Sequence, residues 1–429
     1  MKIGKPKPFF RGVKLDSKKS LACERPVERL SYEGEIAVPL VQHIGAPAVP
    51  VVQTGDRVLR GQLIARAEGF VSANVHASVS GVVKAVEDRA DGQGGTCAHV
   101  VIEQDSAQEN AYLPSLVNPS AQEIAARVRD AGIVGMGGAG FPASVKLSPH
   151  NSVGILLLNG AECEPYLTCD DRLMREQHEK IVRGAHYLAT ALGAERILIG
   201  IEKNKPEALA LFEKTDLEVI ALKKRYPMGS EKHTVYCCTG RKIPVGGLPA
   251  DVGVTVQNVA TAFAVCEAVE EGKPLIERIV TVSGEGVETP ANILAPVGTP
   301  LSVLAERCGV KESAVKIVVG GPMTGAALAG CNGVVTKTTS GLLFLTEKET
   351  DRALPTPCIN CGKCADACPM NLMPMQIEFY TACGNFEDAE KYGGVQSCIG
   401  CGVCSYVCPA RRPLTQAIRT AKQALRRKA

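Results

Sequence analysis

The chain has no tryptophan, and aromatic residues make up only 4% of its 429 residues. It has no apolar run approaching the roughly 20 residues of a membrane-spanning helix, since runs such as 154–158 are strand-sized. The N-terminal text MKIGKPKP lacks an apolar signal core. The 48 basic and 45 acidic residues are too balanced to indicate a nucleic-acid partner. We therefore expect a cytoplasmic protein of two to four domains, at roughly 100–200 residues per domain, with no membrane span of its own.

Basic residues gather near the C-terminal end. A solvated basic helix is the simpler interpretation, and docking to an acidic partner or an anionic membrane surface is the alternative. The residues are Arg411, Arg412, Arg419, Lys422, Arg426, Arg427 and Lys428.

Cysteine is abundant, with 18 residues, and eight of them form two copies of the motif C-x2-C-x2-C-x3-C-P. This is the run of bacterial ferredoxins with two [4Fe–4S] clusters, in which the fourth cysteine binds the other cluster. Zinc is the alternative, but zinc sites use separated C-x2-C pairs, which fit poorly here. The expected ligands are Cys358, Cys361, Cys364 and Cys408 for one cluster, and Cys398, Cys401, Cys404 and Cys368 for the other.

Hydrophobic patterns divide the chain into a multidomain α/β and α+β protein. Strands separated by glycine-rich turns are predicted at 35–40, 48–52, 82–86 and 99–102. Helices at 121–131, 171–192 and 205–213 alternate with strands at 155–158, 196–201 and 218–222, which is typical of a mainly parallel sheet. From 276 the pattern is strand, turn, strand and helix, followed by a strand near 315. The expected domains are an arm (1–34), a barrel-sandwich module (35–110), an α/β domain (118–272), a β-grasp domain (276–345) and a two-cluster ferredoxin domain (350–429).

Two of these modules resemble known folds. The text VQTGDRVLRGQLIA followed by VHASVSGVV resembles lipoyl-type barrel sandwiches, but no lysine lies between 63 and 83 to carry a covalent cofactor. The text from 278 to 309 resembles a β-grasp domain of the soluble-ligand-binding type.

A glycine-rich loop at 132–147 follows the first predicted helix of the α/β domain. Its amides can approach a phosphate or a flavin ring, although a tight turn is the simpler alternative. Asn159, Glu162 and Glu164 follow a buried strand, where open α/β sheets bind ligands. Capping carboxylates in a strand-to-helix loop are the alternative for these residues.

Four motifs occur in the same order as in the flavin- and NADH-binding subunit of respiratory complex I, which the chain resembles in this region. They are GMGGAGFPASVKL, NGAECEP, YPMGSEK and VQNVATA. The resemblance implies FMN bound near most of these positions, with NADH stacking from the side of Phe141 and Glu164. The matching positions are Gly135, Gly137, Gly138, Ala139, Phe141, Lys146, Asn159, Glu162, Glu164, Gly229, Glu231 and Asn258.

The order of modules and the long matches NGAECEPYLTCDDRLMRE, GGLPADVGVTVQNV and CPMNLMP resemble C subunits of Rnf electron-transport complexes. The resemblance implies an NADH-oxidising, membrane-peripheral translocase subunit with FMN and two [4Fe–4S] clusters, whose partners are the other subunits of the complex. FFRGVKLDSKK replaces the family's N-terminal Gly-Gly-x-His-Pro segment. The resemblance therefore leaves open a soluble relative that feeds a proline reductase or a cobalamin-reducing system.

No side chain is assigned acid or base catalysis, because the cofactors carry the chemistry. An electron adaptor without NADH oxidation is the rival hypothesis. Cys163 and Cys169 lie beside the flavin motifs, where packing is the simpler role and a reactive role the alternative. No role is assigned to Cys23 or to the adjacent Cys237 and Cys238.

Overall fold

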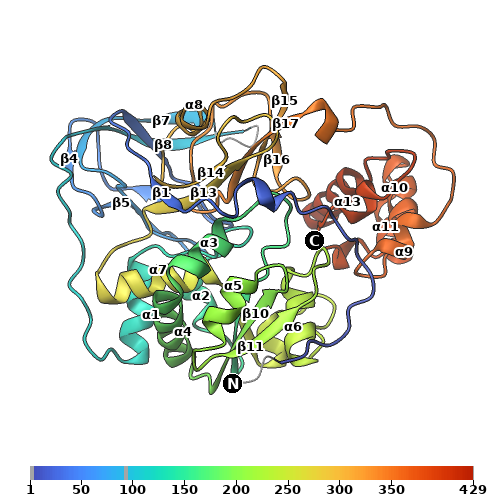
Figure 1. Ribbon diagram of the computed structural model, residues 1–429, viewed down its shortest axis with the longest axis horizontal. Coiled ribbons are helices and arrows are strands. Elements are labelled where there is room, and N and C mark those ends of the chain that lie inside the picture. Colours follow the sequence, from blue (N-terminus) through green and yellow to red (C-terminus); the bar gives the residue numbers. More distant parts are fainter. Residues whose placement is uncertain (1–3, 91–94, 429) are drawn as a thin grey trace.

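The computed structural model describes residues 4–90 and 95–428. In Figure 1 an α/β domain lies below, two β-rich modules lie above it, and a helical cysteine-rich module lies at the right. Residues 1–3 of the predicted arm and 91–94 of the predicted barrel module lie outside the described residues.

The barrel-sandwich module is built from two small sheets with a common apolar core. One sheet has the order β2-β8-β7-β4 and the other the order β3-β5-β6. Ile36, Ile64 and Ile102 are fully buried between them. The predicted strands are confirmed, although the one expected at 48–52 is shorter. The strands are β2 (Glu35–Pro39), β3 (Val49–Pro50), β4 (Arg57–Val58), β5 (Leu63–Arg66), β6 (Val75–His76), β7 (Gly81–Ala90) and β8 (Thr96–Gln104).

The α/β domain has a four-stranded sheet in the order β11-β10-β9-β12, with every pair parallel. The apolar run Leu156–Leu158 is fully buried because helices cover both faces of the sheet. The strands are β9 (Ile155–Gly160), β10 (Arg196–Glu202), β11 (Glu218–Leu222) and β12 (Val254–Asn258). The helices are α1 (Ala121–Asp130), α2 (Ala143–Lys146), α3 (Cys169–Glu176), α4 (His178–Leu192), α5 (Pro206–Phe212), α6 (Glu231–Thr239), the 3-10 turn η2 (Pro249–Val252) and α7 (Val259–Glu270).

The single helix predicted at 171–192 is instead two helices. Gln177 leaves the helical conformation, with φ −133° and ψ 28°, between α3 and α4. The break lets α3 lie against β1 and β13 while α4 packs on α7. Tertiary packing thus overrides a continuous helical pattern.

The β-grasp domain contains a six-stranded sheet in the order β1-β14-β13-β17-β15-β16. Its edge strand β1 (Val27–Arg29) comes from the N-terminal arm and pairs parallel to β14. The predicted strand, turn, strand and helix are confirmed as β13, β14 and α8. The elements are β13 (Glu277–Ser283), β14 (Ala291–Pro296), α8 (Leu301–Cys308), β15 (Ala314–Val319), β16 (Ala326–Leu328), β17 (Gly341–Thr346) and the 3-10 turn η3 (Glu347–Glu349).

The cysteine-rich module consists of short helices around a small core that includes Ile377, Val395 and Ala421. It ends in the predicted C-terminal helix. None of the helices in the described ranges is both long and apolar enough to cross a membrane. The elements are α9 (Lys363–Ala367), α10 (Pro374–Ala382), α11 (Phe386–Gly393), the 3-10 turn η4 (Val395–Ser397), α12 (Val403–Tyr406) and α13 (Leu414–Lys428).

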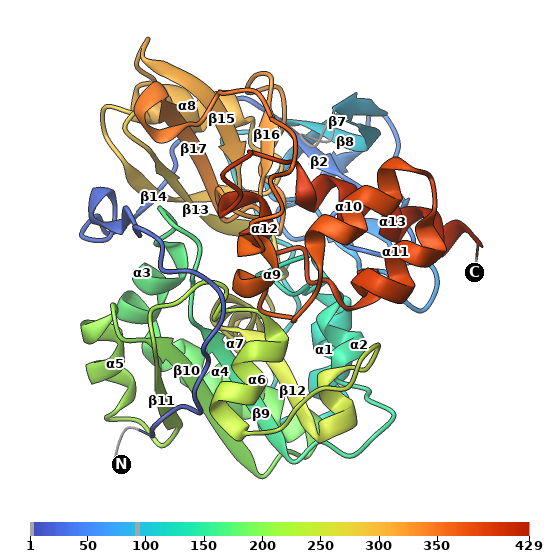
Figure 2. The ribbon, with the colours of Figure 1, turned by 90° about the vertical axis from the view of Figure 1, so that its right-hand side faces the viewer.

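The N-terminal arm runs along the α/β domain and reaches the cysteine-rich module (Figure 2). The amide of Gly4 donates to Val219 O at 2.8 Å, and the amide of Val13 donates to Tyr226 O at 2.9 Å. Between them the amide of Gly12 donates to Ala367 O at 3.0 Å. The arm, which ends in the turn η1 (Lys19–Leu21) before β1, therefore joins two modules that are far apart in sequence.

Candidate flavin and iron–sulfur sites

The glycine-rich loop between α1 and α2 is held at its base. The amide of Gly135 donates to Phe141 O at 2.8 Å, and the amide of Met136 donates to Thr261 Oγ1 at 3.1 Å. The tip, residues 137–139 including Ala139, is exposed. A Cβ on Gly137 would lie 3.1 Å from Asn258 Nδ2, whereas a Cβ on Gly138 would meet no atom within 4 Å. The loop amides therefore line open space beside the end of β12.

Side chains at the carboxyl edge of the sheet form polar pairs beside this loop. Asn159 Nδ2 donates to Gly229 O at 2.8 Å, and Lys146 pairs with Glu231 and donates to Val256 O at 3.1 Å. Asn258 ends β12 and caps α7 by accepting from the amide of Ala260. Exposed amides, an ammonium group and neutral amides suit the phosphate and hydroxyls of a flavin nucleotide. The residues present thus fit FMN.

A cluster of ionisable side chains lies next to this edge of the sheet and includes Glu162, Lys19 and Asp170. Glu162 has φ 44°, accepts from the amide of Asp170 at 2.7 Å and pairs with Lys19 Nζ at 3.1 Å. Asp170 Oδ2 accepts from Asn258 Nδ2 at 2.7 Å. Burial and the neighbouring Glu162 raise the pKa of Asp170. Asp170 therefore holds the side chain of Asn258 in position.

Glu202 belongs to the same cluster and gives a pH-dependent prediction. It is 2% exposed, its Oε1 has no hydrogen-bond partner among the described residues, and burial raises its pKa to about 7. The pKa of Glu202 is higher in the folded state than in the unfolded state. Ionisation of Glu202 therefore lowers the free energy of unfolding as the pH rises from the unfolded-state pKa through about 7. Glu202→Gln cannot ionise at this position. We therefore expect its free energy of unfolding, relative to that of the wild type, to rise by about 3 kcal/mol between about pH 5 and about pH 8. Anaerobic urea unfolding at both pH values measures this, and a pH-independent difference would contradict it.

The carboxylate of Glu164 contacts the β-grasp domain. Its carboxylate accepts from Met323 N at 3.0 Å and from Thr324 Oγ1 at 2.6 Å, both in the β-grasp loop after β15. Burial raises its pKa. Tyr226 Oη lies 3.4 Å from this carboxylate and donates to Cys401 O at 2.8 Å. Glu164 and Tyr226 therefore connect the flavin edge with the second cysteine motif.

The eight motif cysteines line two separate small cavities in the cysteine-rich module. Each cavity combines three cysteines of one motif with the fourth cysteine of the other, which is the predicted exchange. We call them cavity I, lined by Cys358, Cys361, Cys364 and Cys408, and cavity II, lined by Cys368, Cys398, Cys401 and Cys404. The four thiols of each cavity fit a [4Fe–4S] cluster. This grouping supports the crossed ligands, which stay a prediction.

The two cavities differ in exposure. Cavity II faces the α/β domain through the bond from Tyr226 to Cys401 O and a 3.3 Å contact between His233 Nε2 and Pro369 O. Cavity I faces solvent, because Cys358 and Cys361 are exposed and Ile359 between them is 66% exposed. One cavity is therefore next to the flavin edge and the other is open to partners.

Of the cysteines near the flavin motifs, Cys169 is buried and Cys163 is half-buried. Burial raises the pKa of Cys163 to about 12, and its Sγ accepts from the amide of Gly229 at 3.3 Å. Burial also raises the pKa of Cys169. Protonated thiols at neutral pH support the packing role.

Several residues of the site were not predicted from sequence. Tyr226 and Asp170 lie inside the motifs YPMGSEK and NGAECEPYLTCDDRLMRE, so the motifs could have pointed to them as site residues. Lys19 and Lys205 carry no local signal, because only tertiary folding brings them to Glu162.

Comparison with protein families agrees with this arrangement. Four family models match: the RnfC barrel sandwich hybrid domain at 7–107, the Nuo51 FMN-binding domain at 128–267, the SLBB domain at 279–327 and the 4Fe-4S dicluster domain at 357–418. The matches confirm the expected fold classes and the expected FMN and [4Fe–4S] cofactors.

Curated C subunits of three redox complexes match along most of the chain. The one from the proton-translocating ferredoxin:NAD(+) oxidoreductase complex of Clostridium ljungdahlii is 44% identical, covering 97% of this chain and 93% of the relative. Its Na(+)-translocating counterpart from Acetobacterium woodii is 41% identical and covers 97% of both chains. The one from the ion-translocating oxidoreductase complex of Rhodobacter capsulatus is 43% identical, covering 89% of this chain and 76% of the relative.

Proposed function

Because the chain belongs to the family of C subunits of ion-translocating ferredoxin:NAD(+) oxidoreductase complexes, we propose that it transfers electrons between NADH and the other subunits of such a complex. In the direction of NADH oxidation, electrons enter at the flavin edge of the α/β domain. They leave through cavity I of the cysteine-rich module.

The observation that best supports this proposal is the hydrogen bond from Tyr226 to Cys401 O, because it joins the α/β domain to the second cysteine motif. Bound FMN would supply exchange between hydride and single-electron transfer, and bound [4Fe–4S] clusters would supply one-electron transfer. The chain positions these groups. Gly137, Gly138 and Lys146 would hold the flavin nucleotide, and Tyr226 fixes the cavity II loop against the same domain.

The exit is proposed at cavity I because its cysteines are exposed. The whole segment 351–361 is exposed, and it presents Leu354 and Ile359 at 82% and 66% exposure. Part of the nearby basic charge is already paired, since Arg411 contacts Asp351 and Arg412 contacts Glu378. We therefore expect a partner to bind around cavity I through apolar contacts rather than through charge attraction alone.

The chain has no helix suited to crossing a membrane within its described ranges. We propose that it lies at the inner face of the cell membrane through contacts with membrane-spanning partner subunits. Co-sedimentation with membranes only when those subunits are present would support this placement.

An anaerobic titration of the FMN- and cluster-loaded chain with NADH tests the electron path. We expect the visible flavin absorbance to bleach first and the broad cluster absorbance to fall afterwards, because cavity II lies next to the flavin edge. Dithionite serves as the control for complete reduction. If dithionite but not NADH reduces the bound flavin, the chain is an electron adaptor and the NADH step is wrong.

A further inference from the structure

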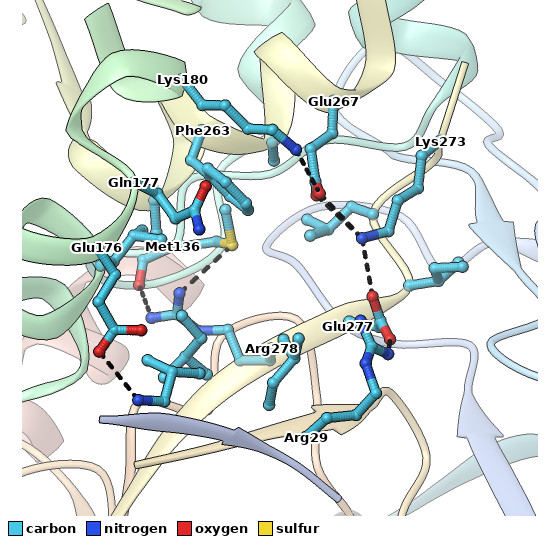
Figure 3. Close-up of a pocket in the computed structure, with 18 of the residues that line it drawn as sticks. Arg29, Met136, Glu176, Gln177, Lys180, Phe263, Glu267, Lys273, Glu277 and Arg278 are labelled. Atoms are coloured by element: carbon cyan, nitrogen blue, oxygen red, sulfur yellow. Dashed lines mark hydrogen bonds and ion pairs between the residues drawn. The ribbon is translucent and has the colours of Figure 1, made fainter. Parts of the chain in front are cut away.

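A cavity in the described part of the chain lies beside Met136 of the glycine-rich loop (Figure 3). It has a volume of about 300 Å³ and opens between the helices α3, α4 and α7 and the strands β1, β13 and β14. This is the lower end of the range of about 300–1,000 Å³ for small-molecule sites, which often lie between domains. None of the twelve residues predicted to contact FMN lines it. The cavity is therefore separate from the flavin edge.

One wall of the cavity is a row of paired charges. Lys273 Nζ lies 3.1 Å from Glu267 Oε1 and 2.8 Å from Glu277 Oε2. Glu277 also pairs with Arg29 and with Arg60, whose Nη2 is 2.6 Å from Oε1. At the other end Lys180 Nζ lies 2.7 Å from Glu271. Every cation in this row has a carboxylate partner.

The facing wall carries a guanidinium without such a partner. Arg278 is 3% exposed, and in the described residues it makes no ion pair within 4 Å. Its Nε donates to Thr339 O at 3.1 Å, Nη2 donates to Met136 O at 3.3 Å, and Nη1 lies 3.5 Å from Met136 Sδ. A guanidinium has five N–H donors, so these contacts leave donors free. Asp170 lies nearby, but it forms no ion pair with Arg278 within 4 Å among the described residues, and its Oδ2 already accepts from Asn258 Nδ2 at 2.7 Å.

The rest of the lining is apolar. Leu173, Phe263, Ile279 and Leu294 face the space beside Arg278. The lining contains four cations, Arg29, Lys180, Lys273 and Arg278, and three anions, Glu176, Glu267 and Glu277. The difference, 4 − 3, leaves one positive charge. A buried charge is stable only when it is paired, so a single negative charge from a ligand would complete the site.

We propose that this cavity binds a small organic monoanion, a carboxylate with an aromatic or branched apolar body. The carboxylate pairs with Arg278, and the apolar body packs between Phe263 and Leu294. A phosphate dianion fits less well, because it would bring two charges to one guanidinium and no apolar surface to the walls. Since Arg278 also donates to Met136 O, the ligand and the glycine-rich loop share one side chain.

Isothermal titration of the full, FMN- and cluster-loaded chain with benzoate tests the proposal. We expect saturable binding of one benzoate per chain, at least about tenfold tighter than that of inorganic phosphate or of the neutral analogue benzyl alcohol. Arg278→Gln should weaken benzoate binding about tenfold to a hundredfold, because a charge-assisted hydrogen bond is lost.

Two further variants keep the result interpretable if Arg278→Gln disturbs the glycine-rich loop. Ala264 lines the cavity from α7, and Ala264→Leu should fill the space and abolish binding while flavin content stays unchanged. Arg29→Gln is the matched charge control, since Lys273 and Arg60 still neutralise Glu277, and it should keep benzoate affinity within about twofold.

Any of three outcomes would overturn the proposal. The first is benzoate binding no tighter than that of phosphate or benzyl alcohol. The second is wild-type benzoate affinity in Ala264→Leu, and the third is a loss of affinity in Arg29→Gln as large as that in Arg278→Gln. None of these measurements depends on NADH oxidation, so the proposed electron path can fail without affecting this site.

Discussion

Replacing Cys408 with serine should remove the cluster of the first cysteine motif, although Cys408 belongs to the second. The reason is that Cys408 lines cavity I with Cys358, Cys361 and Cys364. Cys368→Ser should have the reverse effect and remove the cluster of cavity II. Each variant should fall from about eight to about four irons per chain. Iron analysis and electron paramagnetic resonance of the reduced proteins measure the loss.

The two losses should differ in their effect on electron transfer. Cys408→Ser should leave transfer from the flavin to cavity II intact, because Tyr226 contacts Cys401 and not cavity I. Cys368→Ser should stop transfer out of the flavin. Cys383→Ser is the matched control, since Cys383 is an exposed cysteine of the same module outside both motifs. If Cys408→Ser instead removed the signal assigned to Cys398, Cys401 and Cys404, the ligands would not be exchanged.

Gly138→Val should weaken FMN binding strongly without unfolding the α/β domain. A Cβ at Gly138 would meet no protein atom within 4 Å, and its φ does not lie in the left-handed region. The valine side chain would therefore project into the open space where the loop amides face the ligand. Filling that space should weaken FMN about a hundredfold, which corresponds to about 3 kcal/mol. Fluorescence titration of FMN into the flavin-free chain measures the affinity.

Gly154→Val is the matched control for this substitution. A Cβ at Gly154 also meets no atom within 4 Å, but Gly154 precedes β9 and so lies at the opposite edge of the sheet. Both variants should keep the wild-type unfolding temperature, and only Gly138→Val should lose FMN affinity. Equal FMN affinity in the two variants would place the flavin away from the glycine-rich loop.

Local features of the sequence predicted a large part of this structure. The cysteine spacing predicted which cysteines lie together, because a three-cysteine loop can close around only one cluster. Alternating apolar runs predicted β9, β10 and β11 within two residues of their bounds. These signals succeed because hydrogen bonding and burial within each element depend mainly on neighbouring residues.

Contacts between modules could not be predicted in the same way. The break at Gln177 arises because α3 must contact β1 and β13, and the helical pattern contains no trace of that contact. The bond from Tyr226 to Cys401 and the exposure of Arg278 to a cavity depend on how the modules pack. No periodicity or spacing reports such long-range packing.

The arm at Gly4–Val13 also has a consequence for the order in which the protein assembles. Gly12 bonds to Ala367, and Arg11 Nη1 donates to Ala365 O at 2.8 Å. During synthesis the arm leaves the ribosome before Ala365, which is made more than 350 residues later. Domains generally fold as units while the chain grows. The arm can therefore bridge the α/β domain and the cysteine-rich module only after both have been synthesised.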